Sequence, residues 1–316
     1  MMPDLADILD RIHVVALPMR VRFRGITVRE VALIDGPAGW GEFGAFVEYE
    51  PAEAAHWLAS AVESAYQTPP AAKRDRIPIN ATVPAVAPDQ VPELLSRFPG
   101  AQTAKVKVAE PGQSLVDDVA RVDAVRVLVP TVRVDANGGW TVDEAVEAAT
   151  ALGPLEYIEQ PCKTVDELAE VRRRVDVPIA ADESIRKADD PLRVVRAGAA
   201  DVAVLKVAPL GGTSAVLEVA AQIHIPVVIS SALDSAIGIG IGLQAAAALP
   251  TLNHACGLAT GRLFEEDVVE EVPPQDGYLP AGPVVPDPAR LAALSASPKR
   301  RDWWIRRIID CYHLMH

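Results

Sequence analysis

The chain has 316 residues, half of them hydrophobic, with 43 acidic and 30 basic side chains. The formal net charge of −13 disfavours nucleic acid as a partner, because a polyanion is repelled over most of the surface. The most apolar region, 236–249, is too short to span a bilayer. Three cysteines without disulfide or zinc spacing, and an N-terminus without an export signal, favour the reducing cytoplasm.

The first 76 residues predict an α+β capping domain. Strand-like runs at Val21 to Phe23 and Thr27 to Ile34 precede a glycine-rich turn at Gly36 to Gly41. A helix is expected from Pro51 to Tyr66. This order of elements differs from the repetition that follows it.

From residue 77 to 264 the pattern is one of alternating strands and helices, which predicts an α/β fold, a TIM-type (β/α) barrel. Helical periodicity is clearest at 142–152, 165–174 and 213–223. The tail, 265–316, should pack with the capping domain, and its basic, aromatic stretch at 299–307 should lie against the body. The eight expected strands are 77–83, 104–108, 132–136, 157–160, 179–182, 202–207, 226–230 and 252–255.

Ionisable and polar residues recur near the ends of successive strands, at intervals of 28, 24, 23, 24 and 24 residues. Such an interval is one βα unit, so these side chains should meet at the C-terminal mouth of the barrel, where enzymes of this fold build their sites. A single carboxylate here could be a helix cap, but the shared spacing favours a site. The residues are Lys107, Asp135, Glu159, Asp182, Lys206 and Ser230.

Asp135, Glu159 and Asp182 form a predicted metal site without histidine or cysteine. Carboxylate oxygens suit Mg²⁺, with Mn²⁺ as a substitute, and disfavour zinc. A metal held in this way polarises a substrate carboxylate and stabilises the enediolate that forms when a neighbouring proton is removed. The sequence thus predicts proton abstraction from a small-molecule carboxylate.

Lys107 and Lys206 are the predicted acid–base residues on either side of the metal. Lys105 should share the inner face with Lys107, because side chains alternate along a strand. Repulsion between the two ammonium groups should lower the pKa of Lys107. Lys105 is equally well interpreted as an ion-pair partner of a barrel carboxylate.

Further side chains could support the site. Asn137 and Glu183 adjoin the predicted ligands and could orient them or be purely structural. Ser230 and Ser231 end the seventh strand ahead of three glycines at alternate positions, 238–242, which favour close helix packing. The helix N-terminus there could also bind a substrate carboxylate.

The motifs Lys105-x-Lys107, Asp135-x-Asn137, Glu159-Gln-Pro, Asp182-Glu-Ser and Lys206 resemble those of the enolase superfamily, in its muconate-lactonizing subgroup, over nearly the whole chain. The resemblance implies the modified (β/α)7β barrel with a capping domain. Three further segments resemble the o-succinylbenzoate synthases of menaquinone biosynthesis, namely Phe23-Arg24-Gly25, Gly39-Trp-Gly-Glu42 and Ser230-Ser-Ala-Leu-Asp-Ser235.

That resemblance implies a syn dehydration of 2-succinyl-6-hydroxy-2,4-cyclohexadiene-1-carboxylate to 2-succinylbenzoate. Lys107 would take the proton and then help the hydroxyl leave, while Lys206 stays charged. Arg24, Ser230 and Ser231 would contact the substrate, and the loops at 19–25 and 44–49 would close over it.

Two alternatives remain at this stage. An N-acylamino acid racemase, dipeptide epimerase or cycloisomerase of the same superfamily would keep every ligand and lysine. A non-catalytic barrel that serves as a binding protein would have no need for them. The sequence does not predict an oligomeric state.

Overall fold

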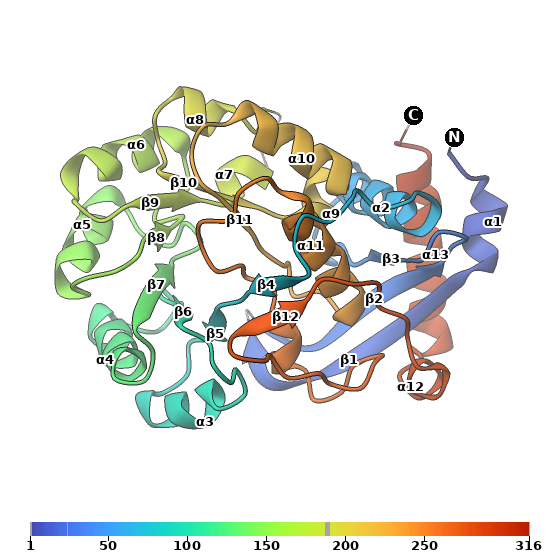
Figure 1. The fold of residues 1–316 in the computed structure, drawn as a ribbon, viewed down its shortest axis with the longest axis horizontal. Helices are drawn as coiled ribbons and strands as arrows, with labels where there is room; N and C mark the ends of the chain where they lie inside the picture. The colour runs from blue at the N-terminus through green and yellow to red at the C-terminus, as the bar shows by residue number, and fades with distance from the viewer. Residues whose placement is uncertain (1, 24, 187–189, 316) are drawn as a thin grey trace.

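The computed structural model describes residues 2–23, 25–186 and 190–315 and divides visibly into two parts (Figure 1). One part is a capping unit in which an antiparallel sheet packs on helices from both ends of the chain. Its sheet runs β1 (Ile12–Phe23), β2 (Ile26–Asp35), β3 (Trp40–Phe43). Its helices are α1 (Leu5–Asp10), α2 (Pro51–Tyr66) and α13 (Pro298–Tyr312).

The two faces of the cap sheet pack into different hydrophobic cores, one of the barrel and one of the cap. Val15 and Leu17 on β1 face the barrel core, whereas Ile12 and Val14 belong to the core of the cap, as the alternation of side chains along a strand requires. β3 lies so close to α2 that a Cβ at Gly41 would stand 2.0 Å from the Ala61 carbonyl oxygen. The glycine-rich turn therefore permits the close packing of sheet and helix.

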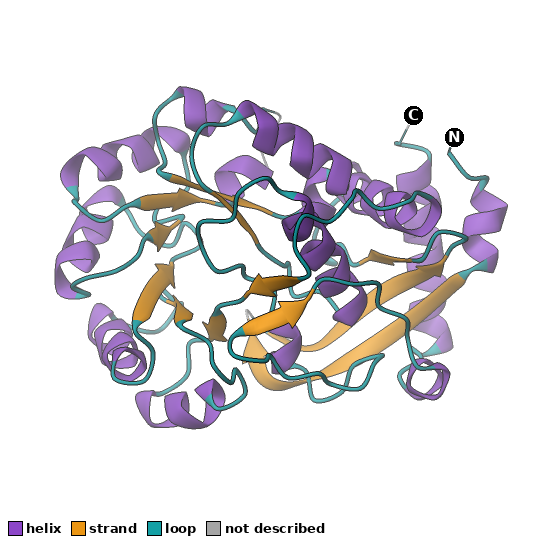
Figure 2. Ribbon diagram, in the orientation of Figure 1, coloured by secondary structure: helices purple, strands orange, loops and turns teal. Residues whose placement is uncertain are grey.

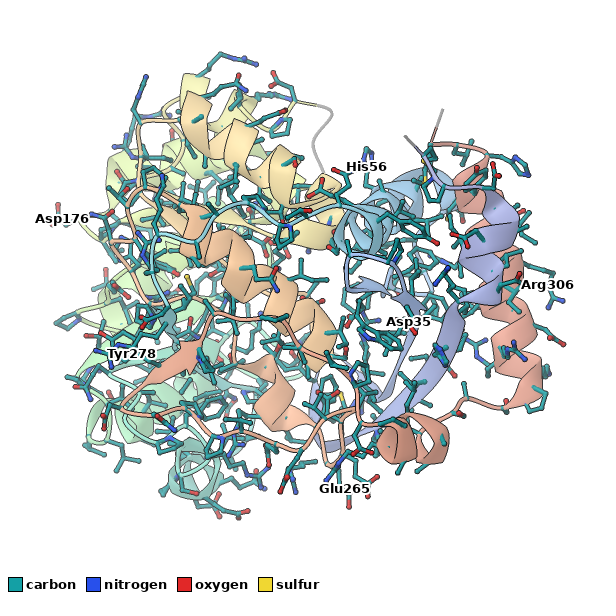
Figure 3. All side chains as sticks on the ribbon, turned by 45° about the vertical axis from the view of Figure 1, so that its right-hand side comes forward. Asp35, His56, Asp176, Glu265, Tyr278 and Arg306 are labelled. Carbon is teal, nitrogen blue, oxygen red and sulfur yellow. The ribbon has the colours of Figure 1, made fainter. Side chains whose placement is uncertain are left out.

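The basic, aromatic tail packs against the body, as the sequence predicts. Trp304 on α13 is fully buried, and its indole donates a hydrogen bond of 3.0 Å to Glu30 on β2. Arg300 also pairs with Glu30, at 2.6 Å. Figure 3 shows Asp35 and Arg306 within this cap region, on the opposite side of the molecule from Asp176 and Tyr278 of the barrel region.

The second part is a curled, parallel sheet inside a layer of helices (Figure 2). Within the described residues this sheet has seven strands, ordered β11-β10-β9-β8-β7-β6-β5. The strands are β5 (Ala81–Val83), β6 (Thr103–Lys107), β7 (Thr131–Asp135), β8 (Ile158–Glu159), β9 (Ile179–Ala181), β10 (Val202–Leu205) and β11 (Val227–Ile229).

Most of the remaining helices connect these strands and cover the outside of the sheet, whereas the last of them, α12, ends beside β1, where the Ala16 amide donates to the Leu294 carbonyl. Capping boxes at Thr141 with Glu144, and at Thr164 with Glu167, start two of them at the predicted positions. The helices are η1 (Pro88–Gln90), α3 (Val91–Leu95), α4 (Leu115–Arg126), α5 (Val142–Ala151), α6 (Val165–Arg174), α7 (Glu183–Arg186), α8 (Arg193–Arg196), α9 (Val207–Leu210), α10 (Thr213–Gln222), α11 (Ala236–Ala248), η2 (Thr260–Leu263) and α12 (Pro288–Ala293).

The first and last expected barrel strands need correction. The run 77–83 is two strands, β4 (Arg76–Pro78) and β5, and β4 pairs antiparallel with β12 (Tyr278–Pro280) of the tail. Between them the Ile79 amide donates to the Gly277 carbonyl and the Asn80 amide to the Cys256 carbonyl, so the two strands bond different partners. The boundaries proposed at 76/77 and 264/265 remain proposals.

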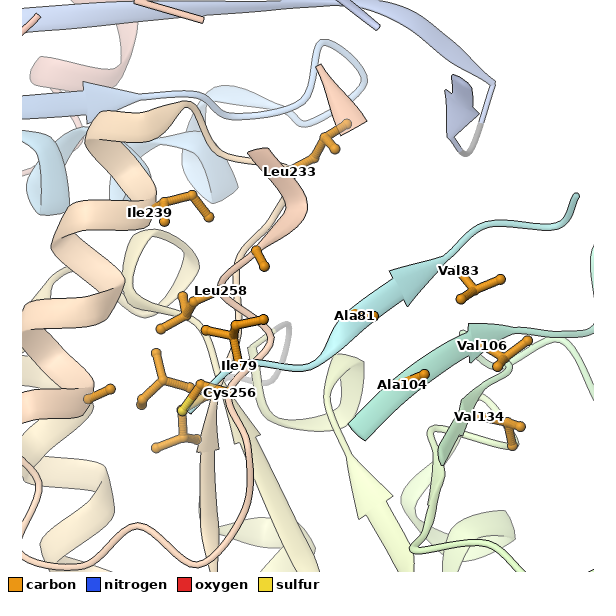
Figure 4. Close-up of a cluster of buried hydrophobic side chains, with 14 of the residues drawn as sticks. Ile79, Ala81, Val83, Ala104, Val106, Val134, Leu233, Ile239, Cys256 and Leu258 are labelled. Atoms are coloured by element: carbon orange, nitrogen blue, oxygen red, sulfur yellow. The ribbon is translucent and has the colours of Figure 1, made fainter. Parts of the chain in front are cut away.

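No strand forms at 252–255 in the described chain. The ring is closed instead by two isolated parallel bridges, Ile79 to Cys256 and Ser230 to Gly257. Figure 4 shows Ile79 beside Cys256 at this seam. Residues 252–255 are held by side chains from the barrel, since Arg133 donates to the Ala255 carbonyl at 3.0 Å and His254 bonds Glu156 at 2.8 Å.

The alternation of side chains gives the barrel an apolar exterior and a mixed interior, in which the apolar side chains of Ala180, Val204 and Val228 lie together and polar side chains extend from β6. Ala104 and Val106 on β6 point outward into the core beneath the helices (Figure 4). Lys105 and Lys107 point inward, as expected for residues two apart on one strand. The three cysteines are buried and form no disulfide, and no helix in the described part of the chain could cross a membrane.

Candidate active site

The parallel register places the predicted site residues side by side at the C-terminal ends of the strands. Lys107 on β6 stands opposite Asp135 on β7, and Asp135 stands opposite Glu159 on β8. Asp182 directly follows β9 and Lys206 directly follows β10. Because neighbouring strands lie about 5 Å apart, these carboxylates and amines are brought within reach of one another.

Each carboxylate is paired with a cation. Lys105 Nζ lies 2.8 Å from Glu159 Oε1, and Lys107 pairs with Asp135. Lys206 Nζ lies 2.6 Å from Asp182 Oδ2. All of these side chains are at least nine-tenths buried, so the pairing neutralises charges that would otherwise be costly away from water. Lys105 thus has the ion-pair role that the sequence left open, and the lowered pKa of Lys107 stays a prediction.

The buried carboxylates differ strongly in proton affinity. Burial, together with repulsion from Asp135, raises the pKa of Glu159 to about 7, although Lys105 opposes the shift. Burial would also raise the pKa of Asp182, but Lys206 and Arg186 outweigh it and hold this pKa well below its usual range. Burial alone would lower the pKa of Lys105, yet Glu159 and Asp135 raise it. Glu159 therefore binds its proton more tightly than Asp182 does.

A small cavity of about 40 Å³ lies at the mouth of the barrel and collects most of the predicted residues. Its polar wall includes Lys105, Lys107, Asp135, Lys206, Ser230 and Ser231. Its opposite wall is apolar and comes largely from the cap, through Phe23, Ile26 and Phe46. Ligand sites usually measure about 300–1,000 Å³, so the cap must give way before a substrate enters.

Side chains that sequence reasoning did not single out also hold the site. Arg186 lines the cavity and donates from Nε to Asp182 Oδ1 at 3.0 Å. Its position four residues after Asp182, on one helical turn, was a usable signal. Gln160 accepts from the Asp182 amide at 3.0 Å and donates to Ser184 Oγ at 2.7 Å, which ties β8 to β9.

Asn137 lies between Lys107, the predicted base, and Glu183, and it bonds both side chains. Its Oδ1 accepts from Lys107 Nζ at 2.9 Å, and its Nδ2 donates to Glu183 Oε1 at 3.2 Å. Asn137 has a left-handed backbone (φ +49°), a conformation that asparagine tolerates better than most residues. The asparagine thus connects the base side of the cavity to α7.

The two serines that follow β11 have different surroundings. Ser230 lines the cavity, while Ser231 Oγ donates to the Gly257 carbonyl at 3.0 Å. The N-terminus of α11 is occupied by protein carboxylates, since Glu42 accepts from the Ser235 and Gly238 amides and Asp267 from the Ala236 amide. The expectation that this terminus binds substrate is therefore not met. Arg24 lies outside the described residues.

The glycines of α11 permit close packing, as predicted. A Cβ at Gly238 would stand 2.6 Å from Asp234, and one at Gly242 would stand 2.5 Å from a methyl of Leu258. These distances are below ordinary contact, so larger residues would push the helix from the barrel.

The donor set fits a divalent cation in its chemistry. Three buried carboxylates from adjacent strand ends provide hard oxygen ligands, with no histidine or cysteine among them. In the described residues their side chains do not converge into a group that could hold an ion, because each is turned to a lysine. The chemistry of the three side chains and their places at adjacent strand ends therefore support a divalent-cation site.

Comparison with known proteins gives the family. Residues 92–287 match the model "Enolase C-terminal domain-like" and residues 14–65 match "Enolase N-terminal domain-like". The protein named o-succinylbenzoate synthase from Mycobacterium marinum is 74% identical to this chain, over 99% of this chain and 96% of its own length. The protein of the same name from Mycobacterium leprae is 71% identical, over 100% of this chain and 95% of its own length. The chain belongs to the o-succinylbenzoate synthase family of the enolase superfamily. The protein of that name from Mycolicibacterium smegmatis is 73% identical over 99% of this chain and 98% of its own length.

Solved structures support the fold of the family. The muconate lactonizing enzyme from Pseudomonas fluorescens superposes with a TM-score of 0.77, covering 90% of this chain and 98% of the other, at 23% identity. An isomerase from Streptomyces coelicolor gives 0.71, also at 23% identity, covering 92% and 96%. At such identity the likeness establishes the capped, curled sheet and not the substrate.

Proposed function

We propose that this chain is an o-succinylbenzoate synthase that dehydrates 2-succinyl-6-hydroxy-2,4-cyclohexadiene-1-carboxylate to 2-succinylbenzoate. The identity of more than 70% with relatives of that name, along nearly the whole chain, carries the proposal. The site adds the chemistry, because amines from β6 and from the end of β10 enter one cavity from strands that β7, β8 and β9 separate.

Lys107 is the proposed base. It lines the cavity beside Asn137 and Asp135, which keep its amine directed at the mouth of the barrel. After taking the proton next to the substrate carboxylate, the same residue returns it to the departing hydroxyl, which leaves as water. Loss of the proton and of the hydroxyl from one face makes the elimination syn and gives an aromatic ring.

Lys206 is proposed to stay protonated and stabilise the negative charge from the other side of the cavity. Its Nζ lies 2.6 Å from Asp182 Oδ2 in a buried setting, which holds the amine at the mouth of the barrel. Fixed positive charge directed at the developing enediolate lowers the barrier of such a step, typically by about 10²- to 10³-fold for one group.

Asp135, Glu159 and Asp182 are proposed to hold the metal. Enzymes of this family depend on a divalent cation, and we propose Mg²⁺, with Mn²⁺ as a substitute. When bound, the ion supplies positive charge to the substrate carboxylate. Lys105 then remains the counter-ion of Glu159, and Arg186 the counter-ion of Asp182.

The cap is proposed to complete the substrate site. Phe23, Ile26 and Phe46 provide apolar surface for the ring of the substrate and exclude water from the lysines. The segments at 19–25 and 44–49 are therefore proposed as the lid. Cytoplasmic location remains a prediction, which the free cysteines support.

The test is the loss of the cyclohexadiene absorbance with purified protein, with and without a chelator. We expect turnover that the chelator abolishes and that added Mg²⁺ or Mn²⁺ restores. Full activity in chelator contradicts the metal assignment. If the protein leaves the cyclohexadiene unchanged but racemises N-acylamino acids, the proposed substrate is wrong and the superfamily chemistry stands.

A further inference from the structure

The segment 230–235 leaves the barrel and passes beneath the cap. Leu233, in its middle, lines the catalytic cavity and has a left-handed backbone conformation (φ +62°). A bulky residue rarely adopts that conformation, and it persists only where surrounding contacts hold it. The contacts that hold this segment come from the cap.

Arg29 on β2 makes the first of these contacts. Its Nε donates to the Leu233 carbonyl at 3.0 Å, and its Nη2 donates to the Gly44 carbonyl. The guanidinium carbon also lies 4.5 Å from the ring centre of Phe46. Arg29 is 96% buried, so one planar cation joins the barrel segment to the cap loop and its aromatic side chain.

Glu42 on β3 makes the second contact, with the other end of the segment. Its carboxylate accepts from the Ser235 amide and the Gly238 amide, both at 3.1 Å, and from Ser235 Oγ. A Cβ at Gly44 would lie 2.9 Å from Arg29 Nη2 and 3.0 Å from Glu42 Oε1. The side chains of Arg29 and Glu42 therefore flank Gly44 closely, and a larger residue there would displace them.

The two walls joined in this way face the same cavity. Phe46 belongs to the cap and Leu233 to the barrel, and both line the space beside Lys107 and Lys206. Neither Arg29 nor Glu42 lines that space itself. They act on the substrate only through the residues that they hold.

We propose that Arg29 and Glu42 are positioning residues, a buried clamp between cap and barrel that fixes Phe46 and Leu233 in the wall of the substrate cavity. The kinetic part of this inference rests on the proposed function. The clamp determines how well a substrate fits, whereas the metal ligands and lysines stand on strands that it does not touch.

The diagnostic variant is Arg29→Lys, which keeps the charge but cannot bond both carbonyls with one planar group. Glu42→Gln tests the other half of the clamp. The matched control is Glu30→Gln, also a cap carboxylate, which bonds Arg300 and Trp304 on α13 and not the 230–235 segment. We measure kcat, KM, thermal stability, Mn²⁺ affinity by calorimetry, and amide hydrogen exchange.

In Arg29→Lys we expect KM to rise about 10- to 100-fold, because hydrogen bonds from a charged group are lost. The kcat and the Mn²⁺ affinity should stay within about threefold of the wild-type values. Exchange should speed up at 44–46 and 230–238 but not in β7 or β8. Glu42→Gln should raise KM less and speed exchange at 235–238. The control should change stability and exchange in α13 and leave KM unchanged.

Unchanged exchange at 230–238 in both clamp variants overturns the clamp, whatever the substrate. Faster exchange with an unchanged KM overturns the positioning role. A KM increase that the control reproduces at equal loss of stability also overturns it, because general loosening then explains the effect. If the wild type does not convert the cyclohexadiene, KM is measured for the N-acylamino acid that it racemises, and the exchange result judges the clamp alone.

Discussion

The two walls of the catalytic cavity are built on different principles. The barrel wall consists of ionisable side chains at strand ends, positioned by the backbone hydrogen bonds of a parallel sheet and neutralised in pairs, as between Lys206 and Asp182. The other wall is apolar and joins Phe46 of the cap to Leu233 of the barrel, and both are positioned by Arg29, which bonds the Leu233 and Gly44 carbonyls. Reactivity is therefore anchored in the rigid sheet, while the fit of the substrate depends on contacts between two separate units.

The largest effects should therefore come from the barrel wall. Lys107→Ala and Lys206→Ala should each lower kcat by about 10²- to 10⁴-fold, because a positioned acid–base group and a fixed charge contribute about that much. The measurement is steady-state turnover of the cyclohexadiene at saturating metal. Lys299→Ala, an exposed lysine on α13, is the control. Near-normal turnover in either site variant ends the two-lysine model.

A substitution in the apolar wall from the cap should change how well the substrate fits, and therefore KM. Phe23→Leu keeps apolar volume but removes the ring that faces Lys107, whose Nζ lies 5.4 Å from the ring centre. We expect KM to rise about 3- to 10-fold and kcat to change little, since aromatic packing of this kind contributes about 0.5–1.5 kcal/mol. Val28→Ala, at a half-exposed position on β2, should leave both constants unchanged. A kcat loss as large as that of a lysine variant would break the contrast between the walls.

The effect with the smallest expected change in turnover concerns Asp267 and appears in stability alone. Burial raises the pKa of Asp267 to about 7, although the Val268 and Ala236 amides donate to it. The folded protein then binds a proton more tightly than the unfolded chain, so this contribution is complete below about pH 4 and is lost as pH rises through about 7.

Asp267→Asn removes this titration. The difference in unfolding free energy between wild type and variant should therefore fall from pH 4 to pH 7 and level off above. Urea unfolding across that range measures it, with Asp310→Asn on the exposed face of α13 as the control. A difference that is constant with pH contradicts the raised pKa, and a change in KM would place Asp267 in the substrate site.

The features that follow a regular spacing or a local motif were predicted from the sequence. A spacing of about 24 residues assigns Asp135, Glu159, Asp182 and Lys206 to successive strand ends, and the structure places them there. Capping boxes likewise define the starts of α5 and α6. Local rules suffice for these features because each residue is positioned by its own βα unit.

The contacts that the sequence did not reveal join residues from distant parts of the chain. Arg29 reaches Leu233, and Glu42 reaches Ser235, across about 200 positions with no repeating pattern to indicate the pairing. The last barrel strand was misplaced for a related reason, since Cys256 and Gly257 close the ring through contacts with Ile79 and Ser230 and not through a run of β-branched residues.

The seam of the ring has a consequence for how the chain folds. Ile79 and Cys256 stand about 180 positions apart, so the ring is completed only after nearly the whole barrel has been synthesised. Directly outside this seam β4 pairs with β12, and the helix that covers Glu30 is the last one of the described chain. Both units therefore await the C-terminal residues, and a nascent chain that stops short of them exposes an open sheet edge to aggregation.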